Sequence, residues 1–186
     1  MTQLKIAAIS GTHHRPSRTN ALIAYLAQGL GSQKARCFDI FDMGRDFGMT
    51  FDRDGAAAGH AEAWDAVVSC DILVVGTPVY KASCTGLFKH FFDLLPPDAL
   101  KNRLVVLSAN ARAPVHALMI DHQLTPLFRF FGALPAPHSI FALDEEFEKA
   151  ADGSGFELQP SLIERCDKVI CAALALYNEG CSNRTS

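Results

Sequence analysis

Short apolar runs alternate with helix-patterned segments along this 186-residue chain. Apolar spacing at i, i+3 and i+4 predicts helices at about residues 19–30, around Trp64, and at 85–95, 115–131 and 161–177. Strands that alternate with helices form a parallel sheet with both faces covered. The runs expected to form strands are LKIAAI at 4–9, residues 35–40, DILVVGTP at 71–78, RLVVLSA at 103–109 and SIFAL at 139–143.

Five strands in this rhythm suit an α/β fold, a flavodoxin-like three-layer sandwich with a five-stranded parallel sheet in the order 2-1-3-4-5. We expect a single domain over residues 1–186, with residues 144–159 as a surface loop. In such a sheet, ligands bind beyond the carboxyl ends of strands 1 and 3. A nicotinamide-binding Rossmann unit would need G-x-G-x-x-G after the first strand, and only Gly11 is present there.

The composition excludes several classes of protein. The formal net charge is −3 and no block of like charges occurs, so no nucleic-acid partner is expected. No apolar run approaches the ~18 residues of a membrane span. The N-terminal stretch reads as a strand rather than a signal peptide, so a cytoplasmic location is predicted.

Metal and disulfide chemistry is not indicated. The six cysteines form no C-x-x-C pair and no zinc-type spacing, and most are expected to be buried and reduced. The tandem His13 and His14 lack a third ligand, so no metal site is expected. Cys84, beside one of the polar turns, has no assigned role.

The first polar turn, GTHHRPSRTN at residues 11–20, lies between a strand and a helix. A helix N-terminus stabilises an anion, hydroxyls add donors, and arginines add charge and bidentate geometry. The turn is therefore a candidate phosphate cradle. The alternative is that Ser17 or Thr19 only caps the helix and that the arginines are solvated. The candidate residues are Thr12, Arg15, Ser17, Arg18 and Thr19.

The second polar turn, TPVYKAS, follows the third strand. Pro78 stiffens the backbone, and Tyr80 offers a flat ring. The amides of Val79 and Tyr80 are predicted to meet the polar edge of a flat heterocycle. The alternative is a plain surface turn with Lys81 in water.

With these turns, the sequence resembles the NAD(P)H-dependent FMN reductases of the flavodoxin-like superfamily. Within that family, it is most similar to the enzymes associated with alkanesulfonate and methanesulfonate monooxygenases. The resemblance covers about residues 4–143. It rests on SGTHHRPSRT, on TPVYKASCTGLFKHFFDLL, on the turn after the fourth strand and on HALMIDHQLTPLF. By position, it places the family's phosphate loop on the five residues of the first turn. It places the flavin-ring loop on Pro78, Val79, Tyr80 and Lys81.

The third loop of the family usually ends in Thr-Gly-Gly and falls here on Asn110, Ala111 and Arg112. Glycines permit close backbone approach, so this departure implies a different wall beside the flavin or nicotinamide. Arg112 is a candidate to meet a phosphate of the pyridine nucleotide. The preference between NADH and NADPH therefore stays open.

The segment at residues 115–131 carries two further expectations. One face of the expected helix is apolar and buried, but Leu118, Met119 and Phe130 fall on its other faces. This additional apolar surface predicts a homo-oligomer, a dimer or tetramer. Pro126 has no N–H for the carbonyl of His122, which predicts a kink or π-bulge there. The residues assigned to the buried face are Ala117, Ile120, Leu124, Leu127, Phe128 and Phe131.

The resemblance sharpens the expectation for His122. The sulfonate-linked reductases carry an inserted aromatic residue or histidine at the matching position, associated with a π-helix at the tetramer interface near the flavin. We expect His122 to stack near the flavin across subunits. The alternative is an interface histidine paired with Asp121 or with a backbone carbonyl.

The resemblance implies an enzyme that passes a hydride from NADH or NADPH to FMN and supplies reduced flavin to a partner monooxygenase. The cofactor carries the chemistry, so no catalytic side chain is expected. Two alternatives stay open. One is a quinone or azo reductase of the same fold that keeps FMN bound. The other is an electron carrier, which would be strongly acidic.

Overall fold

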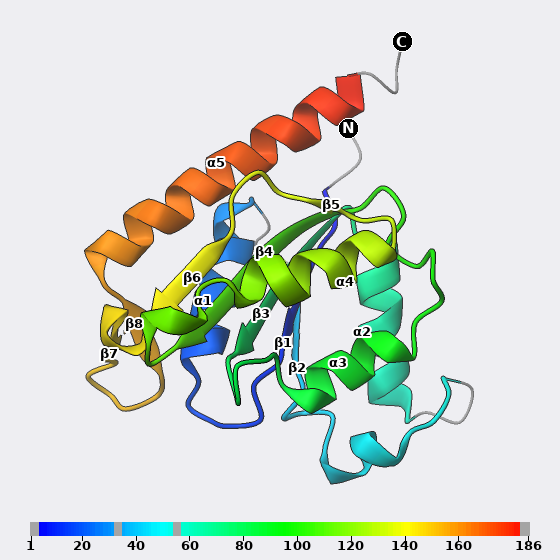
Figure 1. The fold of residues 1–186 in the computed structure, drawn as a ribbon, viewed down its shortest axis with the longest axis horizontal. Helices are drawn as coiled ribbons and strands as arrows, with labels where there is room; N and C mark the ends of the chain where they lie inside the picture. Colours follow the sequence, from blue (N-terminus) through cyan, green and yellow to red (C-terminus); the bar gives the residue numbers. More distant parts are fainter. Residues whose placement is uncertain (1–3, 32–34, 54–56, 183–186) are drawn as a thin grey trace.

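A computed structural model describes residues 4–31, 35–53 and 57–182 of the chain. Its centre is a parallel sheet that begins at one edge with the order β2-β1-β3-β4 (Figure 1). The expected order of the flavodoxin-like sheet is confirmed. The strands are β1 (Ile6–Ser10), β2 (Arg36–Asp39), β3 (Ile72–Pro78), β4 (Leu104–Ala111), β5 (Leu134–Pro135) and β6 (Ile140–Leu143).

Helices cover both faces of the sheet and enclose two separate cores (Figure 1). On one face, α1 (Arg18–Gly29) and α5 (Pro160–Ser182) bury aliphatic residues such as Leu22, Leu26 and Val169. The other face is covered by α2 (Ala58–Ser69), α3 (Gly86–Asp93) and α4 (Thr125–Phe130), around Trp64 and a group of phenylalanines. The apolar strands are buried on both sides, as a parallel sheet requires.

Two short strands fill the fifth position of the sheet, where a single strand was expected. β5 pairs with the first two residues of β4, and β6 pairs with Ser108–Ala111 at its end. Proline at 135 and at 137 supplies no N–H to a ladder, which explains the interruption between the two segments.

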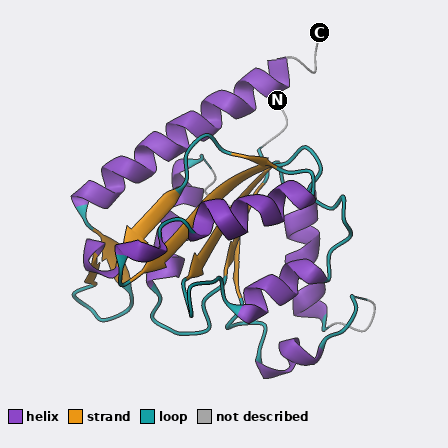
Figure 2. Cartoon of the chain, viewed as in Figure 1, coloured by secondary structure: helices purple, strands orange, loops and turns teal. Residues whose placement is uncertain are grey.

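The expected surface loop at 144–159 is wrong in part. After the 3₁₀ turn η4 (Asp144–Glu146), the strands β7 (Phe147–Lys149) and β8 (Phe156–Leu158) form an antiparallel hairpin (Figure 2). Each strand has three residues, too few for alternation to be recognised in the sequence. A 3₁₀ helix, η1 (Arg45–Met49), follows β2.

The long helix expected at 115–131 is three segments. These are the 3₁₀ turn η2 (Pro114–His116), the π-helix η3 (Ile120–Leu124) and α4. The Thr125 N–H donates to the carbonyl of Ile120, five residues back. The next residue is Pro126, which has no N–H for the carbonyls of Asp121 or His122. The expected π-bulge at His122 is therefore present.

The π-turn changes which residues of this segment are buried. Ile120, Leu124 and Phe128 lie in the core as expected, whereas Met119 is buried and Ala117 is exposed, contrary to the prediction. A π-turn holds one more residue than an α-helical turn, so the residues before it are rotated about the helix axis. Met119 therefore faces the core in place of Ala117. Leu118 and Phe130 remain exposed, at 62% and 68%.

The expectation that most cysteines are buried is also wrong. Of the five whose side chains are described, Cys70 and Cys166 are buried, Cys84 is half-buried, and Cys37 and Cys171 are exposed. Among residues 4–31, 35–53 and 57–182, no helix is long and apolar enough to cross a membrane.

Candidate functional site

The three polar turns singled out in the sequence meet at one edge of the sheet. Parallel pairing sets Ser10 of β1 beside Gly76 of β3, and Pro78 of β3 beside Asn110 of β4. The turns that leave these strands therefore start side by side (Figure 2). This edge is where a doubly wound sheet binds its ligands.

Asn110 joins the three turns by hydrogen bonds. Its side-chain Oδ1 accepts the hydroxyl of Thr19, at 2.6 Å, and its carbonyl accepts the N–H of Val79, at 2.9 Å. Both Thr19 and Asn110 are buried. The first turn of α1, the end of β3 and the end of β4 are thus held by one residue.

Gly11 allows the first turn to pass close under the second. Its N–H donates to the Gly76 carbonyl at 2.7 Å, and its own carbonyl accepts the Thr85 hydroxyl at 2.7 Å. A Cβ at Gly11 would lie 2.9 Å from Thr77 Oγ1 and 3.0 Å from the Phe88 side chain. The close approach, rather than a special φ angle, accounts for the glycine.

The helix that follows the first turn begins with its amides directed at this edge. Ser17 is its N-cap, and its hydroxyl accepts the N–H of Asn20 at 3.2 Å. The first amides of a helix have no partner within it, so those of Arg18 and Thr19 are left for a ligand or for water. Together with the helix dipole, they favour an anion.

Both arginines of the first turn are paired with carboxylates. Arg15 Nη2 lies 2.6 Å from Asp39 and 2.5 Å from Asp42, and the hydrogen bond to Asp39 raises the pKa of its guanidinium. Arg18 lies 3.9 Å from Asp144, and its guanidinium carbon lies 4.4 Å from the centre of the Phe156 ring. Ser17 thus caps the helix, as the alternative expects, whereas both arginines are ion-paired and only partly solvated, with 49% and 35% of their side chains exposed.

Arg18 has a buried donor that no described residue satisfies. Its Nε is buried and has no hydrogen-bond partner among the described residues. The side-chain Oδ1 of Asn20 is likewise buried without a donor. An unpaired N–H and an unpaired acceptor beside the helix N-terminus fit a ligand that carries both phosphate oxygens and hydroxyls, such as FMN.

Asp39 was not predicted as part of the site. It is 6% exposed, and it accepts hydrogen bonds from Arg15, from Asn20 Nδ2 at 2.9 Å and from the Asp42 N–H at 2.8 Å. The signal available in the sequence was its position at the end of a strand next to the first one. Its carboxylate fixes Arg15, and with it the shape of the first turn.

The second turn differs from its prediction. The Val79 N–H donates to Asn110, and the Tyr80 N–H donates to the Ser83 carbonyl at 2.9 Å, so neither amide points at a ligand. The Val79 bond continues the β3–β4 ladder, and the Tyr80 bond closes a tight reversal in which Lys81 and Ala82 have φ values of 53° and 63°. The backbone closes on itself instead of presenting those two N–H groups.

Tyr80 presents its ring at the site, and the first turn contacts it. Its side chain is 39% exposed, and the His13 ring meets it edge-on with 5.2 Å between centroids. Burial, and then the nearby carboxylate of Asp144, raises the pKa of Tyr80. Burial also lowers the pKa of His13, with a smaller effect of His14. His13, which sequence reasoning set aside, thus belongs to the wall of the site.

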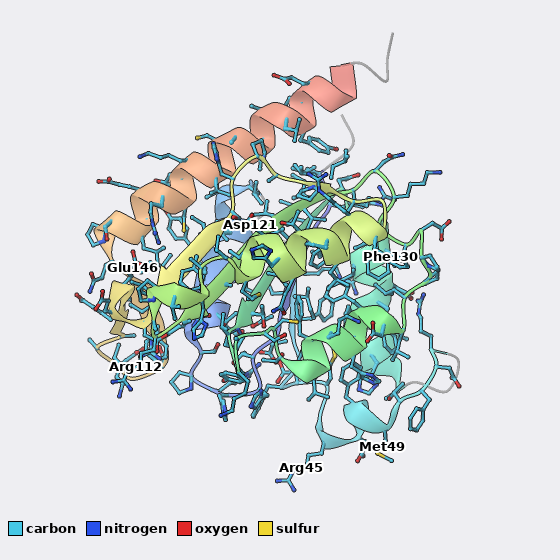
Figure 3. The ribbon with its side chains drawn as sticks, in the orientation of Figure 1. Arg45, Met49, Arg112, Asp121, Phe130 and Glu146 are labelled. Carbon is cyan, nitrogen blue, oxygen red and sulfur yellow. The ribbon has the colours of Figure 1, made fainter. Side chains whose placement is uncertain are left out.

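The third turn runs from a buried to an exposed position. Asn110 and Ala111 are buried, whereas Arg112 points outward from the ribbon (Figure 3). Arg112 lines an open recess of about 500 Å³ with Arg18, Asp144 and Glu145. Two guanidinium groups from separate turns therefore border one polar recess.

His122 is exposed on the π-helix, beside Asp121, which Figure 3 labels. Its neighbour Gln123 is the residue of the π-helix that hydrogen-bonds the second turn. Gln123 was missed because a lone glutamine in a helical pattern gives no signal. Stacking of His122 across subunits is a feature of an assembly and stays a prediction.

Cys84 follows the second turn directly. It is half-buried, and burial raises the pKa of its thiol. A thiol with a raised pKa is a poor nucleophile near neutral pH. In the described part of the chain, no three His, Cys, Asp or Glu side chains are grouped to hold a metal ion.

The chain is similar to several known flavin reductases. The sequence model described as NADPH-dependent FMN reductase matches residues 4–148. The NADH-dependent FMN reductase SfnF of Pseudomonas putida is 35% identical over 178 residues, 94% of this chain and 93% of that protein. The NADPH-type FMN reductase of Pseudomonas aeruginosa is 40% identical over 148 residues, which cover 77% of this chain and 79% of that protein.

Among solved structures, the apo form of the NADH:FMN oxidoreductase EMOB superposes with a TM-score of 0.79 at 28% identity. The match covers 93% of this chain and 89% of that one. Sequence and structure thus agree over nearly the whole length. The chain belongs to the NADPH-dependent FMN reductase family, and it is an NAD(P)H:FMN oxidoreductase that uses FMN and a reduced pyridine nucleotide.

Proposed function

We propose that FMN binds across the three turns, with its phosphate at the start of α1 and its ring against Tyr80. The observation that carries this proposal is the junction at Asn110, which holds all three turns at one edge of the sheet. The phosphate would take the free amides of Arg18 and Thr19 and the Nε of Arg18. The hydroxyl of the buried Thr12, which now donates to the His14 carbonyl at 3.3 Å, would turn to the phosphate. Ser17 caps the helix and orients those amides.

The ring would lie between the second and third turns. Pro78 and Val79 fix the end of β3, Tyr80 and Lys81 offer an aromatic face and a cation, and Ala111 forms the floor. The orphaned Oδ1 of Asn20 supports this placement, because it fits the hydroxyls that link ring and phosphate. When bound, FMN supplies the acceptor for a hydride from the nicotinamide. The chain itself binds, orients and shields the two rings.

The nucleotide would lie over the flavin with a phosphate in the recess beside Arg112. The pairing of Arg18 with Asp144 leaves Arg112 as the second guanidinium of that recess. A guanidinium recognises a phosphate by two parallel hydrogen bonds. We assign Arg112 to the 2′-phosphate of NADPH.

Reduced FMN would be released to a flavin-dependent monooxygenase of the sulfonate-desulfonating kind. The site supports release, because the recess beside Arg112 is open to solvent. The resemblance to the sulfonate-linked reductases gives the partner class. We place the enzyme in the cytoplasm, where its reduced nucleotide is supplied.

A homo-oligomer, a dimer or tetramer, would form through the π-helix and its flanks. Leu118 and Phe130 are exposed on this segment, as are Val115 near its start and Leu134 just after it. Exposed apolar clusters of this kind mark association surfaces. His122 would then approach the flavin of a second subunit. Sedimentation as a monomer at micromolar concentration would contradict this part of the proposal.

The test of the function is turnover with and without added flavin. We expect the purified protein to be colourless and to oxidise NADH or NADPH only when FMN is supplied, because flavin is then the substrate. A yellow protein that oxidises nucleotide only with a quinone or an azo dye would contradict release of reduced FMN. It would instead identify a reductase that keeps its flavin.

A further inference from the structure

The reversal at residues 80–83 has a backbone that its sequence does not favour. Tyr80 and Ser83 exchange both backbone hydrogen bonds, at 2.9 and 3.1 Å, around two central residues in the left-handed region. Such a turn normally uses glycine or asparagine at these two positions, and here they are Lys81 and Ala82. Strain of this kind persists only where neighbouring groups hold the turn.

One side chain from the π-helix holds it. The Ser83 hydroxyl donates to Oε1 of Gln123 at 2.6 Å, and Nε2 of Gln123 donates to the Ala82 carbonyl at 3.0 Å. The Ala82 carbonyl can only accept, so the amide of Gln123 has a single workable orientation. Both ends of this side chain are therefore committed to the turn.

The π-helix places Gln123 within hydrogen-bond distance of the turn at residues 80–83. Ile120 and Leu124 on either side of it are buried in the core, so the position of residue 123 along the helix is fixed. Gln123 itself is half-buried, whereas Asp121 and His122 are exposed. A helix element and the turn that carries Tyr80 are thus tied across 40 residues of sequence.

We propose that Gln123 is a positioning residue for FMN, which keeps Tyr80 and Lys81 in place through the strained turn. The inference rests on the proposed site for the flavin ring. Gln123 contacts the turn and not the ring, so its loss weakens FMN binding without removing any contact to FMN. Relief of the strain by another route then makes Gln123 dispensable.

The test combines substitutions at Gln123 and Ala82. Gln123→Ala is expected to raise the Kd for FMN, measured by quenching of flavin fluorescence, by about tenfold, as the loss of two hydrogen bonds suggests. Ala82→Gly places a residue without a Cβ in the left-handed region, so the double variant should recover most of the affinity. Gln123→Glu keeps the acceptor for Ser83 but loses the donor to Ala82, and it should lie between the two.

Two comparisons keep the result decisive. Lys149→Ala, an exposed change in β7 outside the π-helix and its flanks, should leave the FMN Kd unchanged, and thermal unfolding reports whether each variant is folded. Equal FMN affinity in the wild type and Gln123→Ala would overturn the inference alone, as would failure of Ala82→Gly to rescue a folded Gln123→Ala. A wild-type protein that does not bind FMN would overturn the proposed function, and this inference with it.

Discussion

The hydroxyl of Thr19 lies 2.6 Å from Oδ1 of Asn110, although the two residues are 91 positions apart in the chain. Thr19 lies in the first turn of α1, and Asn110 is the last residue but one of β4. Since the Asn110 carbonyl also holds Val79, this contact sets the spacing between the phosphate end and the ring end of the proposed flavin site.

Thr19→Val should therefore impair both stability and FMN binding. The variant keeps the shape of the side chain but leaves Oδ1 of Asn110 buried without a donor, which costs about 1–3 kcal/mol in the free energy of unfolding. Urea denaturation and FMN titration measure the two effects. Ser108→Ala removes another buried hydroxyl bond of β4, at 2.7 Å to Val75, and should affect stability alone. Equal losses of FMN affinity in both variants would count against the junction.

Substitution of Arg15 should affect mainly the stability of the fold, and substitution of Arg18 should affect mainly FMN binding. Arg15→Ala removes one of three donors to the buried Asp39 and, because Arg15 itself is half-exposed, the free energy of unfolding should fall by about 1 kcal/mol. Lys89→Ala, which breaks an exposed i,i+4 pair with Asp93, should cost about 0.5 kcal/mol or less.

Arg18→Ala should instead weaken FMN binding by about 10- to 100-fold, the range of charged hydrogen bonds, with little change in stability. Fluorescence titration with FMN and with riboflavin, which lacks the phosphate, measures this loss. Riboflavin affinity should be the same in the wild type and the variant. If Arg18→Ala weakened both ligands alike, its contact would not be with the phosphate.

Arg112→Ala should raise the KM for NADPH by about tenfold and leave that for NADH within about twofold, as the loss of one charged contact predicts. Lys149→Ala removes the same charge from an exposed position of β7 and serves as the control. Steady-state kinetics at fixed FMN checks the result. Equal increases for both nucleotides would move Arg112 from the 2′-phosphate to the shared pyrophosphate.

Pro126→Ala should convert the π-turn into a regular α-helix. The new N–H can bond the carbonyl of His122 in the α-helical pattern, which removes the reason for the wide turn at Ile120–Leu124. Gln123 would then rotate away from Ser83, and FMN affinity should fall. A crystal structure of the variant decides the matter. Persistence of the π-turn would mean that Pro126 is not its cause.

Much of the fold could be predicted from the sequence because its signals are local. The apolar runs give the strands, and the carboxyl ends of neighbouring parallel strands meet at one edge, which brings the three turns together. Pro126 marks the π-helix, because a missing N–H disrupts the helix wherever the rest of the chain folds.

The remaining features depend on distant partners or on backbone angles that no residue type announces. Asp39 and Asp42 reach Arg15 from 24 and 27 positions away. Lys81 and Ala82 adopt left-handed angles without glycine, so the use of the Tyr80 amide within the turn was not foreseeable. The β7–β8 hairpin is too short to be recognised.

The most direct test is a crystal structure of the protein with FMN. The account predicts the phosphate at the N-terminus of α1, within hydrogen-bond distance of the Thr19 amide and Arg18 Nε, and the ring against Tyr80. A flavin whose phosphate lies away from the first turn, or whose ring does not contact the turn at residues 80–83, would contradict it.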